Sequence, residues 1–141
     1  MINNPFVGIA GNIGVGKTTL ARALSLELGA RLVLDPADEN PFLSKFYADP
    51  RKHAFQTQLF FMLTRFKQQE DLNQGDLFAK GTVCDYLFAR DRIFAALNLE
   101  EAEFALYERI YTLLHTRVPH PNLVVYLQAR PDVLMERMRR R

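Results

Sequence analysis

Short apolar runs alternate along the chain with longer stretches in which apolar residues recur every three or four positions. The short runs predict strands at residues 5–10, 31–34, 82–84 and 123–127, of which the first and the third are expected to be buried. The longer stretches predict helices at residues 17–28, 51–73 and 98–117, and Pro131 suits the first turn of a final helix. Strands that alternate with helices predict an α/β fold, with a parallel sheet covered by helices on both faces.

The same periodicity assigns individual side chains to the predicted core. Leu20, Leu24 and Leu28 recur every fourth residue on the first helix, which is expected to end at Gly29. Residues 98–101 form a capping pattern that predicts the start of the helix reaching about residue 117. Further core candidates, most of them on one face of the long helix, are Phe55, Leu59, Met62, Leu63, Phe66, Cys84, Phe88 and Phe94.

Composition narrows the class of protein. The 141 residues suffice for one compact domain, expected to span residues 1–141. Hydrophobic residues make up 48% and charged residues 24%, which excludes a disordered or low-complexity chain. The net charge of +2 predicts no nucleic-acid partner, because its excess lies in the C-terminal arginines Arg137, Arg139, Arg140 and Arg141.

The cysteine count, the apolar runs and the two ends of the sequence predict the cellular compartment and whether the chain is complete. One cysteine, Cys84, cannot form an internal disulfide, which suits a reducing compartment. The sequence has no apolar run of membrane-span length and no signal-peptide pattern at its start, so we expect a cytoplasmic protein without a membrane partner. The sequence stops inside a basic helix, and we therefore expect a C-terminal part to be missing.

A glycine-rich segment between the first strand and the first helix has the P-loop pattern of Gly, four residues, Gly-Lys-Ser/Thr. Its glycines allow successive N–H groups to surround a phosphate, and the helix N-terminus adds a partial positive charge. Lys17 is expected to reach the β- and γ-phosphates, and the Thr18 hydroxyl to bind Mg²⁺. The predicted nucleotide-binding residues are Gly11, Asn12, Ile13, Gly14, Val15, Gly16, Lys17, Thr18 and Thr19.

Two acidic residues follow the next two predicted strands. Asp35 comes after residues 31–34, and Asp85 comes directly after residues 82–84. The carboxyl ends of parallel strands meet at one edge of a sheet, where ligands of such folds bind. We therefore expect both carboxylates beside the P-loop. ATPases, GTPases and small-molecule kinases all have a P-loop, but the Asn-Lys-x-Asp guanine-reading motif of GTPases is absent here.

Several segments together resemble the deoxynucleoside kinase family, closest to its deoxyguanosine/deoxyadenosine kinase branch. They are the P-loop, Asp35-Pro36, the stretch from Asn40-Pro-Phe-Leu to Gln58, residues 85–94 and residues 123–137. The resemblance covers essentially the whole chain. It implies a three-layer P-loop kinase fold and ATP-dependent phosphorylation of the 5′-hydroxyl of a deoxynucleoside. It also implies Mg²⁺ as cofactor and a homodimer formed through helices.

The resemblance also implies a role for individual residues. Asp35 would accept the proton of the 5′-hydroxyl, and Tyr47 would lie near the sugar 3′-hydroxyl. Gln58 would read the base, with Arg65 as its partner and Asp91 fixing that arginine. The spacing agrees, because residues seven apart lie within about 20° of one helix face. Asp85 would help Thr18 to hold Mg²⁺, and the lid arginines that close over the phosphates would include Arg137 and Arg141.

Two residues depart from the family pattern. Asp35 stands where the family usually has glutamate, and its side chain is one methylene shorter. Tyr86 stands where the family usually has an arginine that steadies the transferring phosphoryl group, and tyrosine carries no positive charge. Arg90 or Arg92 could replace that charge, or the lid could supply it.

Two alternatives to a deoxynucleoside kinase remain open at this point. A nucleoside-monophosphate kinase would need basic residues for the phosphate of its acceptor, whereas Gln58, Arg65 and Asp91 suit a neutral base. A nucleotide-binding protein with little catalysis is favoured by Tyr86 and by the abrupt C-terminus. The sequence leans weakly towards a purine deoxynucleoside as the substrate.

Overall fold

The computed structural model describes residues 4–12, 14–75 and 79–140. Its internal contacts divide the chain into two compact units. The first, here called the sheet unit, comprises Met1–Asp35, Asp76–Leu87 and His120–Arg141. The second, here called the helical unit, comprises Pro36–Gly75 and Phe88–Pro119. Each unit has its own hydrophobic core.

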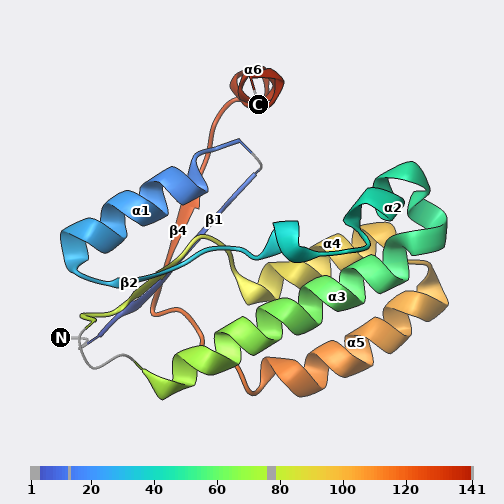
Figure 1. Ribbon diagram of the computed structural model, residues 1–141, viewed down its shortest axis with the longest axis horizontal. Coiled ribbons are helices and arrows are strands. Elements are labelled where there is room, and N and C mark those ends of the chain that lie inside the picture. Colours follow the sequence, from blue (N-terminus) through green and yellow to red (C-terminus); the bar gives the residue numbers. More distant parts are fainter. Residues whose placement is uncertain (1–3, 13, 76–78, 141) are drawn as a thin grey trace. The chain divides into compact units, whose positions relative to one another are not determined.

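The sheet unit contains a parallel sheet in the order β2-β3-β1-β4 (Figure 1). Its strands are β1 (Phe6–Gly11), β2 (Arg31–Val33), β3 (Thr82–Cys84) and β4 (Leu123–Leu127). The central strand β1 pairs Gly8 with Cys84 on one side and with Val124 on the other. The predicted α/β class and the parallel sheet are therefore confirmed.

Two helices complete the sheet unit, α1 (Lys17–Leu28) and α6 (Pro131–Arg139). Both begin where the sequence predicts, and Gly29 ends α1 in the left-handed region at φ 65°. Two small residues, Ala21 and Ser25, occupy the buried positions of α1. Leu20 and Leu24 lie beside them and are half-buried. Leu28, predicted in the core, is exposed at the last residue of the helix.

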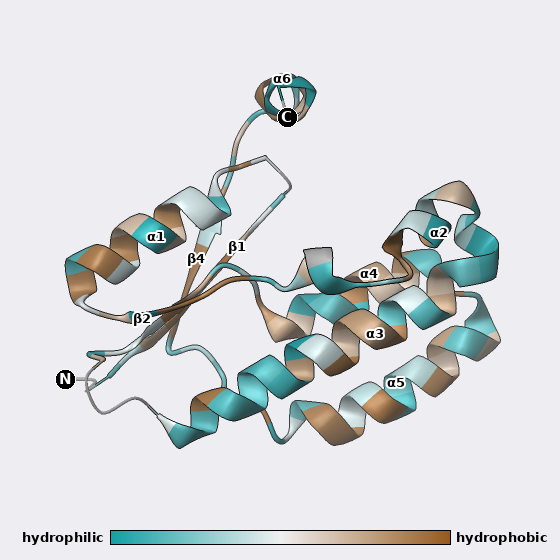
Figure 2. Cartoon of the chain, in the orientation of Figure 1, coloured by the Kyte–Doolittle hydropathy of each residue, from teal (hydrophilic) through white to brown (hydrophobic). Residues whose placement is uncertain are grey.

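The helical unit is built around one long helix. Its helices are α2 (Leu43–Ala48), α3 (Pro50–Asp71), α4 (Asp91–Asn98) and α5 (Glu101–His115), with short 3₁₀ turns at Ala37–Glu39, Leu72–Gln74 and Phe88–Arg90. Figure 2 shows brown and teal segments alternating along α3 and α5, as expected for half-buried helices. Their buried core contains Ala54, Met62, Phe88, Ala95, Leu99, Tyr107, Tyr111 and Val118.

Three details of the predicted helices are wrong. Leu63 is half exposed, because its neighbour Met62, about 100° away around α3, occupies the core position. Phe94 is exposed for the same reason, with Ala95 buried beside it. The capping residues of α5 are Glu100 and Glu103, and not the start of the segment 98–101, because α4 continues through Asn98.

Among the helices of the described residues, none combines the length and the apolar character that a membrane span requires.

Candidate active site

The P-loop connects the end of β1 to the start of α1 within the sheet unit. Gly14 and Gly16 have φ values of 83° and 102°, a region that residues with a Cβ rarely adopt. The Val15 N–H donates to the Asn12 carbonyl oxygen at 3.2 Å, which forms a tight turn. Ile13, also predicted to bind nucleotide, lies outside the described residues.

The start of α1 brings an ammonium group and several backbone N–H groups to this loop. The Nζ atom of Lys17 donates to the Gly11 carbonyl oxygen at 2.6 Å, so the ammonium group lies over the loop. Helix geometry directs the first-turn N–H groups of Lys17, Thr18 and Thr19 towards the same region. This arrangement can bind the phosphates of a nucleotide.

Asp85 joins the P-loop to the residue predicted to act as the base. Its Oδ2 accepts the Thr18 hydroxyl at 2.7 Å, and its Oδ1 accepts the backbone N–H of Asp35 at 2.8 Å. The Asp85 N–H in turn donates to the Val33 carbonyl oxygen at 3.1 Å. The expected meeting of Thr18, Asp35 and Asp85 at the carboxyl edge of the sheet is therefore confirmed.

The Thr18 hydroxyl and the Asp85 carboxylate fit a magnesium ion chemically. Mg²⁺ prefers oxygen ligands and usually takes one or two from the protein, with the rest from phosphate and water. Within the described ranges, no group of three or more histidine, cysteine, aspartate or glutamate side chains could hold a metal ion by itself. A Mg²⁺ ion held by Thr18 and Asp85 would take its other ligands from phosphate and water.

Arg137 of α6 lies against the outer side of the P-loop. Its Nη1 donates to the carbonyl oxygens of Gly14 at 3.0 Å and Val15 at 3.3 Å. In a trans peptide the carbonyl and the following N–H point in opposite directions. Arg137 therefore favours a loop whose N–H groups at Val15 and Gly16 point away from α6. Arg141, the other predicted lid arginine, lies outside the described residues.

A cavity adjoins the same loop. It has a volume of about 450 Å³ and lies between the P-loop, the end of β4 and the start of α6. Its lining residues are Asn12, Val15, Tyr126, Leu127, Gln128, Ala129, Arg130 and Leu134.

Tyr86, which replaces the family arginine, directly follows Asp85 in the sequence. Its side chain is buried and carries no charge.

The predicted base-reading residues lie in the helical unit, on α3. Gln58 is only 4% exposed, and its Oε1 has no hydrogen-bond partner among the described residues. An unpaired buried carbonyl oxygen costs free energy, on the order of 1–3 kcal/mol, unless a ligand or water satisfies it. The Gln58 Oε1 atom is therefore available to accept a hydrogen bond from a ligand or a water molecule.

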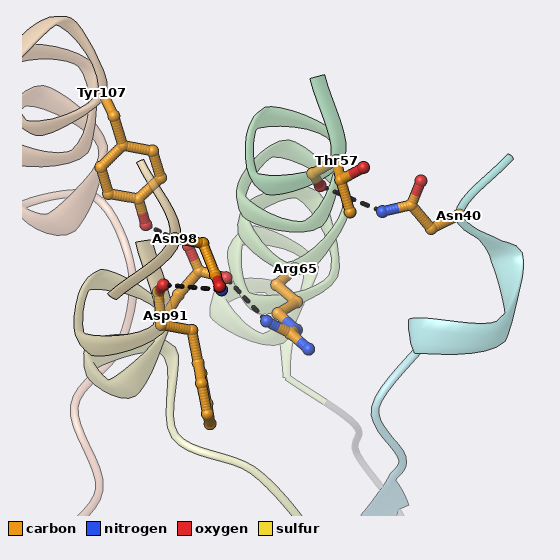
Figure 3. A network of polar contacts seen from close by, with 7 residues as sticks. Asn40, Thr57, Arg65, Asp91, Asn98 and Tyr107 are labelled. Carbon is orange, nitrogen blue, oxygen red and sulfur yellow. Dashed lines mark hydrogen bonds and ion pairs between the residues drawn. The ribbon is translucent and has the colours of Figure 1, made fainter. Parts of the chain in front are cut away.

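Arg65 and Asp91 form a buried ion pair, as expected (Figure 3). Arg65 Nη1 lies 2.6 Å from Asp91 Oδ1, and the guanidinium carbon lies 4.6 Å from the centre of the Phe61 ring. The second Asp91 oxygen, Oδ2, accepts a hydrogen bond from the Tyr107 hydroxyl. Tyr107 was not singled out from the sequence, although its helical spacing from Phe104 and Tyr111 marks it as a core residue.

Tyr47, which is predicted to lie near the sugar, is exposed to solvent. It lies on α2 and is 73% exposed, with its ring 5.7 Å from that of Phe46. Asn40 connects the start of this segment to α3, because its Nδ2 donates to the Thr57 carbonyl oxygen at 3.0 Å (Figure 3). Its Oδ1 accepts the Phe42 N–H.

Comparison with known proteins agrees with these features. The deoxynucleoside kinase family model matches residues 7–141. Deoxyguanosine kinase of Bacillus subtilis is 37% identical over 97% of this chain and 67% of its own length. Deoxyadenosine/deoxycytidine kinase of the same organism is 31% identical over 98% of this chain and 66% of its own length. The chain thus spans about two thirds of these relatives.

Solved structures show the same fold. A deoxyadenosine kinase from M. mycoides with the products dCMP and dCDP superimposes with a TM-score of 0.81 at 23% identity, over 96% of this chain and 70% of that one. The same kinase with bound dATP gives a TM-score of 0.79 at 22% identity, over 98% and 72%. Together with the matched family model, these findings confirm at the family level the expectation of a kinase: the chain belongs to the deoxynucleoside kinase family.

Proposed function

We propose that this protein transfers the γ-phosphoryl group of ATP to the 5′-hydroxyl of a purine deoxynucleoside. The observation that carries the proposal is the buried amide of Gln58, whose Oε1 has no partner among the described residues. An amide offers both a donor and an acceptor, which suits the hydrogen-bonding edge of a base. The relative from Bacillus subtilis named deoxyguanosine kinase supports a purine.

The sheet unit holds the phosphate donor in this proposal. The P-loop N–H groups and Lys17 bind the phosphates. Arg137, with Arg141, acts as a lid arginine: when nucleotide binds, its guanidinium leaves the Gly14 and Val15 carbonyl oxygens and turns to the phosphates, where it neutralises charge. When bound through Thr18 and Asp85, Mg²⁺ supplies charge neutralisation at the phosphate oxygens. Asp85 also holds the backbone of Asp35 through the 2.8 Å hydrogen bond, which fixes where the Asp35 side chain begins.

The helical unit holds the nucleoside, with Gln58 and Arg65 on the base and Tyr47 near the sugar. The 5′-oxygen attacks the γ-phosphorus in line as the bond to the β,γ-bridging oxygen breaks. The proton of the hydroxyl passes to the Asp35 carboxylate, and ADP leaves. Because aspartate is one methylene shorter than the usual glutamate, the fixed Asp35 backbone determines how closely the carboxylate reaches that proton.

Replacing Gln58 by leucine tests the base pocket. Gln58→Leu removes the amide from a buried site, so we expect the KM for the deoxynucleoside to rise by roughly 10- to 100-fold, with the KM for ATP changed less than about twofold. Steady-state kinetics with each substrate varied in turn measure both. Gln56→Leu makes the same change on the exposed side of α3 and should leave both constants unchanged. Equal increases for both substrates in Gln58→Leu would contradict the assignment.

One observation favours a nucleotide-binding protein with little catalysis. Tyr86 is buried directly after Asp85 and cannot supply the positive charge of the usual arginine. An arginine at a phosphoryl-transfer site can contribute about 10³-fold or more to the rate. Measuring ATP affinity and turnover on the same sample separates the two functions, because only the kinase combines ATP binding with deoxynucleoside-dependent ADP release.

We also propose a homodimer, which the family resemblance implies is formed through helices, and we place its interface on α4 and α5. Apolar side chains are exposed along both helices, namely Ile93, Phe94, Leu97, Leu106 and Leu113. Leu106 and Leu113 are two helical turns apart and share one face of α5. Apolar side chains gathered on neighbouring helices are typical of a surface that is covered in an assembly.

A charge placed on this surface should separate the subunits. Leu113→Glu introduces a carboxylate at a position whose side chain is 72% exposed in the single chain. We expect this change to raise the dimer dissociation constant by about 100-fold or more, because the dimer would bury the charge. Sedimentation velocity over a range of concentrations measures this. Leu26→Glu, at a similarly exposed leucine on α1, should have no effect. A monomeric unsubstituted protein, or equal effects of both changes, would contradict the proposed interface.

The proposal includes a cytoplasmic location. The one cysteine of the chain, Cys84, is buried as a strand residue, which fits a protein that folds under reducing conditions. Localisation of a tagged protein in cell fractions tests this directly.

A further inference from the structure

We propose that Tyr107 is a positioning residue for nucleoside binding, which acts by fixing Asp91 and, through Asp91, the guanidinium of Arg65. This inference rests on the proposed function, in which Arg65 contacts the base. The three residues come from different helices, α5, α4 and α3 (Figure 3). Their hydrogen bonds therefore connect Tyr107 on α5, through Asp91, to Arg65, the proposed base-contacting residue on α3.

The ring of Tyr107 is held rigidly. It is fully buried and is stacked between Phe104, at 6.1 Å and 15° between ring planes, and Tyr111, at 6.2 Å and 16°. A tyrosine has only two side-chain torsions, so a ring confined on both faces leaves its hydroxyl one direction. That direction leads to Asp91.

Burial keeps the Tyr107 hydroxyl protonated. Removal from water raises the pKa of the phenol far above its ordinary value, and the neighbouring Asp91 carboxylate raises it further. The hydroxyl is therefore a hydrogen-bond donor at neutral pH. Its hydrogen bond to Asp91 stabilises a carboxylate that is itself completely buried.

The two oxygens of Asp91 have separate partners. Oδ2 accepts from Tyr107, and Oδ1 accepts from Arg65 at 2.6 Å. A carboxylate held at both oxygens cannot rotate about its last torsion without breaking one hydrogen bond. Removal of the Tyr107 hydroxyl would weaken this restraint, because Asp91 Oδ2 would lose one donor inside the core.

Arg65 transmits the effect because its guanidinium is planar. Asp91 fixes one edge of the plane and Phe61 lies under its face, so the directions of the remaining N–H groups are determined. The Arg65 side chain is 12% exposed, and Gln58 lies two turns earlier on nearly the same face of α3. A small rotation of Asp91 therefore misaligns a donor group beside the base.

The test compares Tyr107→Phe with Tyr111→Phe. Both remove one hydroxyl from the same aromatic stack, but only the first removes the hydrogen bond to Asp91. We expect Tyr107→Phe to raise the KM and the Kd for the deoxynucleoside by about tenfold, with the Kd for ATP unchanged. Tyr111→Phe should leave all three constants within about twofold of the unsubstituted protein.

A double substitution distinguishes positioning from a general loss of stability. If Tyr107 acts through Arg65, then Tyr107→Phe added to Arg65→Met raises the nucleoside Kd no further than Arg65→Met alone. Independent, additive effects would overturn the inference, and so would equal effects of Tyr107→Phe and Tyr111→Phe. Asp91→Asn probes the same path if Tyr107→Phe does not fold: it weakens the hold on Arg65, and an unchanged nucleoside Kd would overturn the inference.

Calorimetric nucleoside binding and turnover are measured separately, so that the two proposals fail in different ways. An unsubstituted protein that binds the deoxynucleoside without releasing ADP contradicts the kinase but still tests Tyr107 through the Kd. An unsubstituted protein that does not bind any deoxynucleoside overturns both.

Discussion

Asp35→Asn should lower kcat for deoxynucleoside phosphorylation by about 10³-fold, because asparagine cannot accept the proton of the 5′-hydroxyl. The affinity for ATP should remain within about twofold, since phosphate binding depends on the P-loop. The Asp35 backbone N–H keeps its hydrogen bond to Asp85 in this variant, so the edge of the sheet is expected to be preserved. Single-turnover kinetics with saturating ATP measure the chemical step directly.

Two further variants sharpen this result. Glu39→Gln removes an exposed carboxylate four residues further along and should leave kcat unchanged. Asp35→Glu restores the residue usual in the family and should retain a kcat far above that of Asp35→Asn. An Asp35→Asn variant with nearly normal kcat would show that another group accepts the proton.

Lys17→Met should reduce kcat by about 10³-fold, because it removes the ammonium that neutralises charge developing on the β- and γ-phosphates. The Lys17 ammonium lies 2.6 Å from the Gly11 carbonyl oxygen and is therefore already placed over the loop. Methionine has a similar length and no charge, so the change is electrostatic rather than steric. Turnover and nucleotide affinity should be measured on the same preparation.

Lys80→Met is the matched control for this change. Lys80 is an exposed lysine of the sheet unit, and its loss should leave turnover within about twofold. If Lys17→Met and Lys80→Met have the same small effect, the P-loop of this chain does not support phosphoryl transfer.

The strands and the P-loop could be predicted because their residue types follow directly from their environment. Residues 82–84 and 123–127 form strands with the predicted bounds, since both are rich in β-branched and apolar residues. β3 lies inside the sheet, whereas β4 lies at its edge and is largely exposed. The P-loop requires glycine at positions such as Gly14 and Gly16, where φ is positive. The meeting of Thr18, Asp35 and Asp85 followed from their places after consecutive strands.

The helical unit was harder to predict because polar residues occupy core positions. The inward face of α3 carries Thr57, Gln58 and Gln69, so its apolar pattern is interrupted and Leu63 was wrongly assigned to the core. α4 begins with the buried Asp91 and is only eight residues long, too short for a clear period. The link from Asp91 to Tyr107 joins residues 16 apart in sequence and becomes visible only when the helices pack.

The most direct test of the central claim is ADP release from ATP and Mg²⁺ in the presence of each of the four natural deoxynucleosides in turn. The proposed function predicts release that depends on a deoxynucleoside and is fastest with deoxyguanosine or deoxyadenosine. Binding of ATP without release in the presence of any deoxynucleoside would contradict it, and would instead support a nucleotide-binding protein in which Tyr86 has replaced a catalytic charge.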